Sequence, residues 1–188
     1  KMALVIAVVA ALLACACASL EPDCDWERVL SGGDDPQVEV LLQCRLRTIG
    51  NADSVLSNLT SAQLDMITSL KLECSDVLFF ESSLESNSYL TQLRRLRELK
   101  LEFCKIRFVP PAVLSVSKEL RNLTLRTHNT DWSAMAMEFH SDSFRGLTQL
   151  KYLDLSDNNI WSFPKELFCP LYTMTSLNLS KNRIQEII

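Results

Sequence analysis

The chain has 188 residues, with 19 Lys or Arg against 23 Asp or Glu, so its formal net charge of −4 argues against nonspecific binding of nucleic acid. A hydrophobic fraction of 47% with 22% charged residues is typical of a chain that forms a core, and it excludes wholesale disorder and collagen. Seven cysteines are many for a cytosolic protein and indicate an oxidising compartment.

The N-terminal segment, KMALVIAVVAALLACACASL, is one cation followed by an apolar run that ends in small residues. Residues 16–18 have the A-x-A form of a signal-peptidase site, which predicts a signal peptide over residues 1–18. Two alternatives stay open at this point. One is an uncleaved membrane anchor, and the other is a bacterial lipoprotein signal with Cys15 as the lipidated residue.

Residues 19–66 are predicted to form a cysteine cap and a first coil that precede a set of repeats. Cys24 and Cys44 flank a predicted strand that contains Val38, Val40 and Leu42. The first coil of a stacked repeat array has one uncovered apolar end, and secreted proteins often close such an end with a disulfide-linked cap. We therefore expect a disulfide between Cys24 and Cys44.

The remaining chain, residues 67–188, contains a repeat that is clearest where LKYLDLSDNNIWSF at 150–163 aligns with MTSLNLSKNRIQEI at 174–187. Both segments fit L-x-x-L-x-L-x-x-N-x-I-x-x-hydrophobic, the leucine-rich repeat. The same frame gives repeat starts near 67, 96, 120, 150 and 174. The pattern predicts an α/β leucine-rich-repeat solenoid. Its curved parallel β-sheet forms the concave side, short helices and irregular turns form the convex side, and the N-terminal disulfide cap precedes it.

Position 9 of each repeat is expected to point inward and to bond the backbone where the strand ends. Asn158 and Asn182 have this role in the last two repeats, and His128 is expected to act as a buried donor and acceptor in the third. Cys104 at the same position has two open interpretations: a disulfide with Cys74, or a reduced thiol in the asparagine role. Cys169 is then left over, and an unpaired cysteine in a secreted chain suggests a partner outside the given sequence.

The segment THNTDWSAMAMEFHSDSF at 127–144 is longer than its neighbours need, so it is expected to bulge from one edge of the solenoid. Three N-x-S/T sequons predict glycosylation at Asn58, Asn122 and Asn178, and the last two fall on the concave sheet.

No catalytic motif is present, and the two histidines, His128 and His140, have no metal-ligand spacing. No enzyme activity and no cofactor or metal are therefore expected. The carboxylates Asp154 and Asp157 are interpreted as a solvated face, and Arg94, Arg95 and Arg97 form at most a weak polyanion patch because Glu residues interleave with them. Side chains on the concave face that do not point into the core are available to a partner. The predicted ligand-binding residues among them are Lys71, Lys100, Thr124, Tyr152 and Asp154.

The run RTHNTDW at 126–132, together with NNIWSFP and LFCPL, resembles the N-terminal ectodomain of arthropod Toll receptors of the Tollo and eighteen-wheeler type. The resemblance covers about residues 93–188 closely and removes the lipoprotein interpretation. It implies the extracellular part of a single-pass cell-surface receptor in innate immune or developmental signalling. Its implied partners are Spätzle-like cystine-knot ligands or another receptor ectodomain. The net charge adds the expectation that nucleic acid is not a partner.

The chain departs from that family by stopping at Ile188 in mid-repeat, without a second apolar span or a TIR domain. Membrane attachment is therefore expected only through a transmembrane segment missing from these residues, and Cys169 is expected to pair with a downstream cysteine. Leu177, Leu179, Ile184 and Ile187 would then line an open end that favours association. The alternative functions are an adhesion or matrix protein with the same repeats and no signalling domain, and a secreted decoy.

Overall fold

The structure is a computed structural model of the chain and describes residues 23–30, 38–50, 59–74, 81–84, 89–128 and 136–187. The predicted signal peptide and the sequon residue Asn58 lie outside the described residues.

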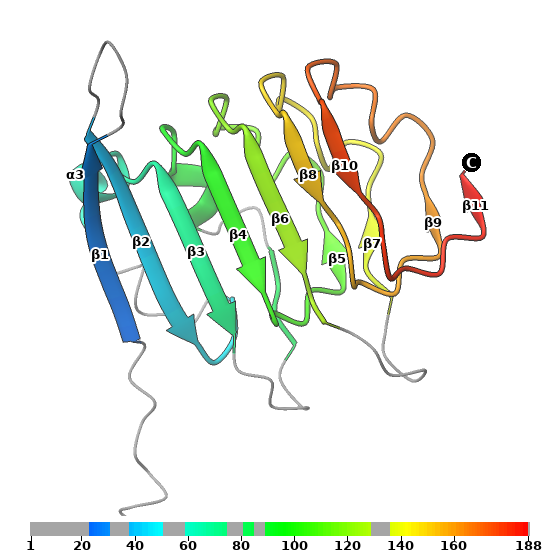
Figure 1. The fold of residues 1–188 in the computed structure, drawn as a ribbon, viewed down its shortest axis with the longest axis horizontal. Helices are drawn as coiled ribbons and strands as arrows, with labels where there is room; N and C mark the ends of the chain where they lie inside the picture. Colours follow the sequence, from blue (N-terminus) through cyan, green and yellow to red (C-terminus); the bar gives the residue numbers. More distant parts are fainter. Residues whose placement is uncertain are drawn as a thin grey trace, which may run out of the picture.

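One seven-stranded sheet organises the fold, and Figure 1 shows its strands side by side in chain order. The strands are β1 (Asp23–Leu30), β2 (Val38–Leu46), β3 (Ser69–Cys74), β4 (Glu98–Glu102), β6 (Asn122–Arg126), β8 (Tyr152–Asp154) and β10 (Ser176–Asn178). Only the β1–β2 pair is antiparallel, and the other neighbours pair in parallel. From β3 on, every sheet strand begins two residues after a predicted repeat start, which confirms the leucine-rich-repeat solenoid.

Each coil returns on the other side of the core through short segments rather than long helices. Two small parallel sheets lie there: β5 (Phe108–Val109) with β7 (Glu138–Phe139), and β9 (Ser162–Phe163) with β11 (Glu186–Ile187). Within the described ranges, helix is limited to α3 (Ser61–Leu64) and the 3-10 turn η1 (Tyr89–Gln92). The helix α3 starts at a capping box, in which the Thr60 side chain accepts from the Gln63 N–H.

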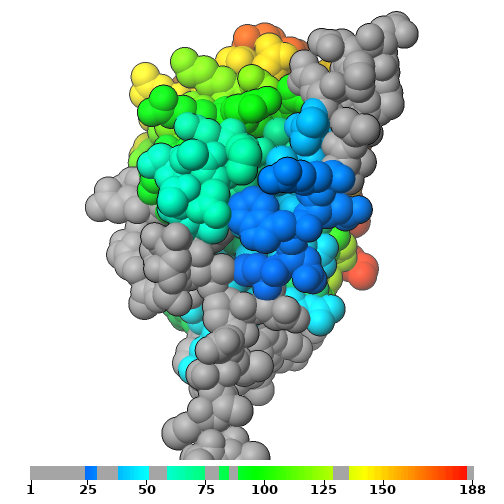
Figure 2. Space-filling view, turned by 90° about the vertical axis from the view of Figure 1, so that its left-hand side faces the viewer, coloured from blue at the N-terminus to red at the C-terminus, as the bar shows by residue number. Residues whose placement is uncertain are grey.

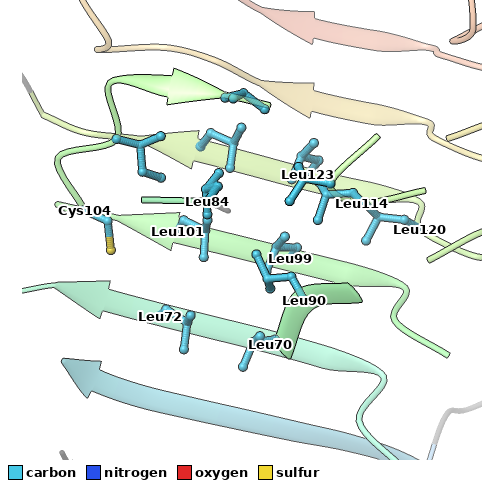
Figure 3. Packing of buried hydrophobic residues seen from close by; sticks show 14 of the residues in the cluster. Leu70, Leu72, Leu84, Leu90, Leu99, Leu101, Cys104, Leu114, Leu120 and Leu123 are labelled. Carbon is cyan, nitrogen blue, oxygen red and sulfur yellow. The ribbon is translucent and has the colours of Figure 1, made fainter. Parts of the chain in front are cut away.

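The core consists of the inward leucines of successive coils stacked on one another. Figure 3 shows Leu70 and Leu72 of β3 beside Leu99 and Leu101 of β4, and all four are buried. Parallel pairing in register places Leu70 next to Leu99 and Leu72 next to Leu101, so one coil buries the apolar face of the next. The last sheet strand departs from this pattern, because Leu177 is 39% exposed while the equivalent Leu153 is 0% exposed.

The N-terminal cap contains a strand that the sequence pattern does not predict. The segment DCDWERVL alternates polar and apolar residues only over its first five positions, yet all of it forms β1, paired with Val38 to Arg45 of β2. Cys24 lies opposite Cys44 in this register, and the two are joined by a disulfide, as expected. Figure 2 views this end of the molecule, where the blue atoms of β1 form the outer surface beside the teal segment that includes α3.

The C-terminal part of the long segment at 127–144 lies in the core. Met137 and Phe139 are buried, and Phe139 packs against the rings of Phe144 and Phe163. Residues 129–135, which include Trp132, lie outside the described residues. The expected bulge falls largely on these residues and stays a prediction.

Candidate functional site on the concave face

The concave face is the surface of the seven-stranded sheet that points away from the leucine core. Strand register aligns Lys71, Lys100, Thr124, Asp154 and Asn178 in one row across β3, β4, β6, β8 and β10. Tyr152 lies in the neighbouring row, two residues before Asp154 on β8. The structure thus brings the five predicted ligand-binding residues onto one surface, although they differ in their availability.

Asp154 is a structural residue rather than an exposed contact, because only 7% of its surface is accessible. Its Oδ1 accepts the Ser156 N–H at 2.9 Å, and its Oδ2 accepts the Tyr152 hydroxyl at 3.1 Å. Burial acts to raise the pKa of the Asp154 carboxyl, but hydrogen bonds from Ser156, Tyr152 and Asn178 outweigh it and hold this pKa below the ordinary value. The interpretation of Asp154 as part of a solvated face is wrong.

Tyr152 shares this hydrogen-bond network. Partial burial, followed by the negative charge of Asp154 and the hydrogen bond to it, raises the pKa of the Tyr152 hydroxyl. The hydroxyl therefore stays protonated and keeps its role as donor to Asp154. Tyr152 is half-buried, so it offers a partner only part of its surface.

The two lysines of the row also differ. The Lys100 ammonium lies 2.8 Å from Glu102 Oε2, and Arg126 Nη1 lies 3.3 Å from Glu102 Oε1. Lys100 is thus charge-compensated by its own sheet. Within the described part of the chain, no ion pair of Lys71 is found, so Lys71 is the lysine of this row whose charge is available to a partner.

His128 does not occupy the inward position-9 site. It is half-buried at the end of the strand, with its ring stacked on Phe103 at 4.0 Å and its Nδ1 3.0 Å from Asp157 Oδ2. Its backbone has a φ of 54°, in the left-handed region. The prediction of a buried donor and acceptor is wrong. Asp157, also expected in a solvated face, is buried beneath His128.

The asparagines of the last two repeats confirm their predicted role. Asn158 Oδ1 accepts the Thr127 N–H at 2.8 Å, and Asn158 Nδ2 donates to the carbonyl oxygens of Leu125 and Leu155 at 2.6 and 2.9 Å. Asn182 repeats the arrangement one coil further, donating to Leu155 at 2.7 Å. Each side chain therefore joins the backbones of two adjacent coils.

The cysteines at the start of the array are paired. A disulfide joins Cys74 at the end of β3 to Cys104, which follows β4, and both residues are buried. Of the two interpretations left open for Cys104, the structure has the bridged one. Cys169 is a free thiol on an exposed turn.

The two sequon asparagines within the described residues also lie on the concave face, in different surroundings. Asn122 is exposed at the start of β6, next to Glu98 of β4 and Tyr152 of β8. Asn178 is half-buried at the end of β10, where its Oδ1 accepts the Ser180 N–H at 3.1 Å.

The basic cluster at 94–97 is partly neutralised. Arg97 forms ion pairs with Glu39 at 3.5 Å and Glu119 at 3.3 Å, while Arg94 and Arg95 are exposed. His140 is exposed, and its Nδ1 accepts the Asp142 N–H. Over the ranges that the structure describes, no group of three His, Cys, Asp or Glu side chains is arranged to hold a metal ion, and no helix has the length and apolar character needed to cross a bilayer.

The structure contains a cavity that the sequence pattern does not predict. It has a volume of about 550 Å³, lies between β7 and β9, and is lined by Met137, Phe139, Trp161 and Phe163 among others. Trp161, which is 52% exposed at its rim, is the residue in the sequence that signals it. This cavity is on the side of the coil away from the concave face, since β9 belongs to the returning segment.

The fold and the asparagine-linked coils define a leucine-rich-repeat solenoid, and the family model described as leucine rich repeat matches residues 138–184. Within that class the sequence is similar to a Toll-type ectodomain. It is 36% identical over 122 residues to Toll-like receptor 7 of Drosophila melanogaster, an alignment that covers 64% of this chain and 8% of the receptor. The chain therefore corresponds to a small part of that relative.

Two solved structures resemble the fold at low sequence identity. The leucine-rich-repeat ectodomain of the receptor kinase SOBIR1 from Arabidopsis thaliana has 14% identity and a TM-score of 0.45, with 87% of this chain and 82% of that chain covered. The Toll–Spätzle complex from Drosophila has 16% identity and a TM-score of 0.41, with 93% and 34% covered.

Proposed function

We propose that the chain is part of the extracellular ligand-recognition region of a Toll-type transmembrane receptor in innate immune or developmental signalling. The observation that carries the proposal is the 36% identity to Drosophila Toll-like receptor 7 over 122 residues. Two disulfides support an oxidising, extracellular environment. The array alone is shared by adhesion proteins, so the sequence similarity is what favours a receptor.

The proposed ligand is a Spätzle-like cystine-knot protein that contacts the N-terminal part of the concave face. A preformed sheet binds a folded partner with little ordering cost. Lys71 is the proposed electrostatic anchor, because Lys100 is paired with Glu102 and Asp154 is buried. The expected ligand surface at Lys71 is therefore acidic.

The test measures binding of the secreted chain to a panel of Spätzle-like cystine-knot dimers by biolayer interferometry. Lys71→Glu is expected to weaken binding about tenfold, equivalent to about 1.4 kcal/mol. The matched control is Lys118→Glu, an equal charge change at an exposed residue of a convex turn. Because exposed charges are screened, the effect of Lys71→Glu should shrink at high salt.

Equal losses in the two variants would contradict a concave site. Binding to none of the cystine-knot proteins, combined with aggregation of beads coated with the chain itself, would favour the adhesion alternative. Capture of single-stranded RNA in place of protein would contradict a protein ligand.

A further inference from the structure

We propose that His128 is a proton-dependent link between three coils. At acidic pH its imidazolium joins Asp157, in the coil of β8, to Glu102, in the coil of β4, and at neutral pH only the contact with Asp157 remains. The link makes the array more stable in an acidic compartment. It involves no ligand, so its test is independent of the proposed function.

His128 lies directly after β6, between the coils that contain β4 and β8, and Figure 1 shows these three strands side by side. Its Nδ1 lies 3.0 Å from Asp157 Oδ2, and its Nε2 lies 3.9 Å from Glu102 Oε1. Glu102 is the last residue of β4, and Asp157 follows β8. One imidazole ring therefore spans three consecutive coils.

The contact with Asp157 determines which nitrogen carries the proton in the neutral ring. A carboxylate only accepts hydrogen bonds, so Nδ1 must hold the proton that it donates to Asp157 Oδ2. Nε2 is then an acceptor, and it faces a second acceptor, Glu102 Oε1. Nε2 is buried and has no hydrogen-bond partner among the described residues. The neutral ring thus presents a buried lone pair to a carboxylate, which is unfavourable.

A proton on Nε2 removes this mismatch. The 3.9 Å contact then joins a cation to a carboxylate, and an approach of about 1 Å gives a charge-assisted hydrogen bond of ordinary length. Asp157 gains a counter-charge as well, because it is 5% exposed and no other cation in the described part of the chain pairs with it. The His128 ring also lies at 15° to the Phe103 ring, with 4.0 Å between centroids, and an aromatic face attracts a cation.

Two neighbouring cations oppose the added charge. Arg126 Nη1 lies 3.3 Å from Glu102 Oε1, and Lys100 Nζ lies 2.8 Å from Glu102 Oε2. The imidazolium is therefore a third cation at this carboxylate, and Glu102 stabilises it less than an unshared carboxylate would. Asp157 is not shared in this way and is closer, so it supplies the larger part of the attraction.

Two further charged residues lie near the cluster, one from the coil on each side. Glu73 of β3 lies beside Glu102 in the strand register, and Lys181 follows Ser180, whose carbonyl accepts the Asp157 N–H. Within the described ranges neither forms an ion pair with the cluster. Their charges have opposite signs, so they change the balance little.

The pH dependence has a definite sign. The protonated ring makes contacts in the folded chain that the unfolded chain lacks. The added stability is therefore present at acidic pH and is lost as pH rises through the range, about pH 5 to 8, in which histidine changes its charge. Two amides beside the ring report on the same coils: the Phe103 N–H donates to the Arg126 carbonyl at 2.9 Å, and the Thr127 N–H donates to Asn158 Oδ1 at 2.8 Å.

The first experiment measures urea unfolding of the full chain at about pH 5.5 and about pH 7.5 in the parent and in His128→Asn. Asn tolerates a positive φ and its amide can donate to Asp157, but it has no titrating group. Between the two pH values, acidification should raise the folding equilibrium constant of the parent about tenfold relative to this variant.

The matched control is His140→Asn, which changes the other of the two histidines. His140 is exposed, and its ring only accepts the Asp142 N–H. This variant should keep most of the parent's response to pH.

The second experiment identifies the partner and needs no global unfolding. Glu102→Gln keeps an oxygen opposite Nε2 and removes its charge, so the tenfold response should fall to about threefold or less. Hydrogen exchange of the Phe103 and Thr127 amides, corrected for the intrinsic pH dependence of exchange, should show protection that rises on acidification in the parent. The same protection should stay flat in His128→Asn.

Several results would overturn the proposal. One is a pH response in His128→Asn equal to that of the parent, and another is a response that disappears in His140→Asn. An unchanged response in Glu102→Gln would assign the effect of the proton to Asp157 alone and contradict the link to the third coil. If His128→Asn does not fold, flat protection of the Phe103 amide in the parent contradicts the proposal.

Discussion

Asn158 shows how a single side chain joins two coils. Its amide bonds the backbone of Thr127 and Leu125 in one coil and of Leu155 in its own coil. These backbone groups lie where the strands end and the chain turns, so they have no partner in the sheet, and an unpaired buried group costs stability. The residue type is dictated locally, because an amide provides both a donor and an acceptor at one position.

A second single residue, Asp154, is expected to make the free energy of unfolding depend on pH. Its folded-state pKa is lowered, so it contributes stability above the ordinary carboxyl value of 3.8 that is lost as pH falls through the lowered value. Asp154→Asn should therefore lower the free energy of unfolding at neutral pH and reduce its decline on acidification. Urea unfolding followed by circular dichroism at a series of pH values measures both.

The control for this prediction is Asp65→Asn, which removes an exposed carboxylate after α3. It should leave the acid decline close to that of the parent chain. An undiminished decline in Asp154→Asn would show that other groups cause the acid sensitivity.

At the scale of elements, the disulfides are placed at the N-terminal end of the array. The Cys24–Cys44 bridge holds β1 against β2, and the Cys74–Cys104 bridge joins the ends of the coils that contain β3 and β4. These early coils have no inward Asn ladder: Cys104 takes the position that Asn158 and Asn182 have later. A covalent link there replaces the hydrogen bonds that the asparagines make.

Removal of the Cys74–Cys104 bridge by the double change to serine should destabilise the chain by about 3 to 4 kcal/mol, the chain-entropy value for a loop of this size. The separation of the two cysteines is 30 residues. Differential scanning calorimetry measures the loss. Cys169→Ser, at an exposed free thiol, is the control and should change stability by less than about 0.5 kcal/mol.

At the scale of the whole molecule, stability is a sum of contacts between neighbouring coils. Leu99 and Leu101 of β4, for example, have inward leucines of β3 on one side and of β6 on the other, and Figure 3 shows part of this stack. Leu177 is covered less than its counterparts and is 39% exposed. The energetic weight of a leucine therefore depends on its place along the array and not on its repeat position alone.

This dependence predicts different costs for the same substitution. Leu153→Ala, at a residue that is 0% exposed, should cost about 2 to 5 kcal/mol in free energy of unfolding. Leu177→Ala should cost less than half as much, because less apolar surface is removed from a packed environment. Equal costs, measured by chemical denaturation, would argue against additive stacking of coils.

The sequence by itself determined the repeat frame, the inward leucines, the ladder asparagines and the Cys24–Cys44 bridge. The first three follow from a side chain's position within its own coil, where the period of the chain sets which side faces the core. The bridge follows from the need to cover the apolar end of the array. The predicted ligand-binding residues lie on one face of the sheet, because register is preserved from coil to coil, and their role in binding stays a prediction.

Only the tertiary structure decided which of those residues are available. Asp154 and Asp157 are buried, His128 stacks on Phe103, and DCDWERVL pairs as β1. For His128 and for β1 the deciding partner comes from another coil or strand, roughly 8 to 25 residues away along the chain. A local pattern carries no information on such a partner, because burial, charge pairing and strand pairing are properties of two segments brought together by folding.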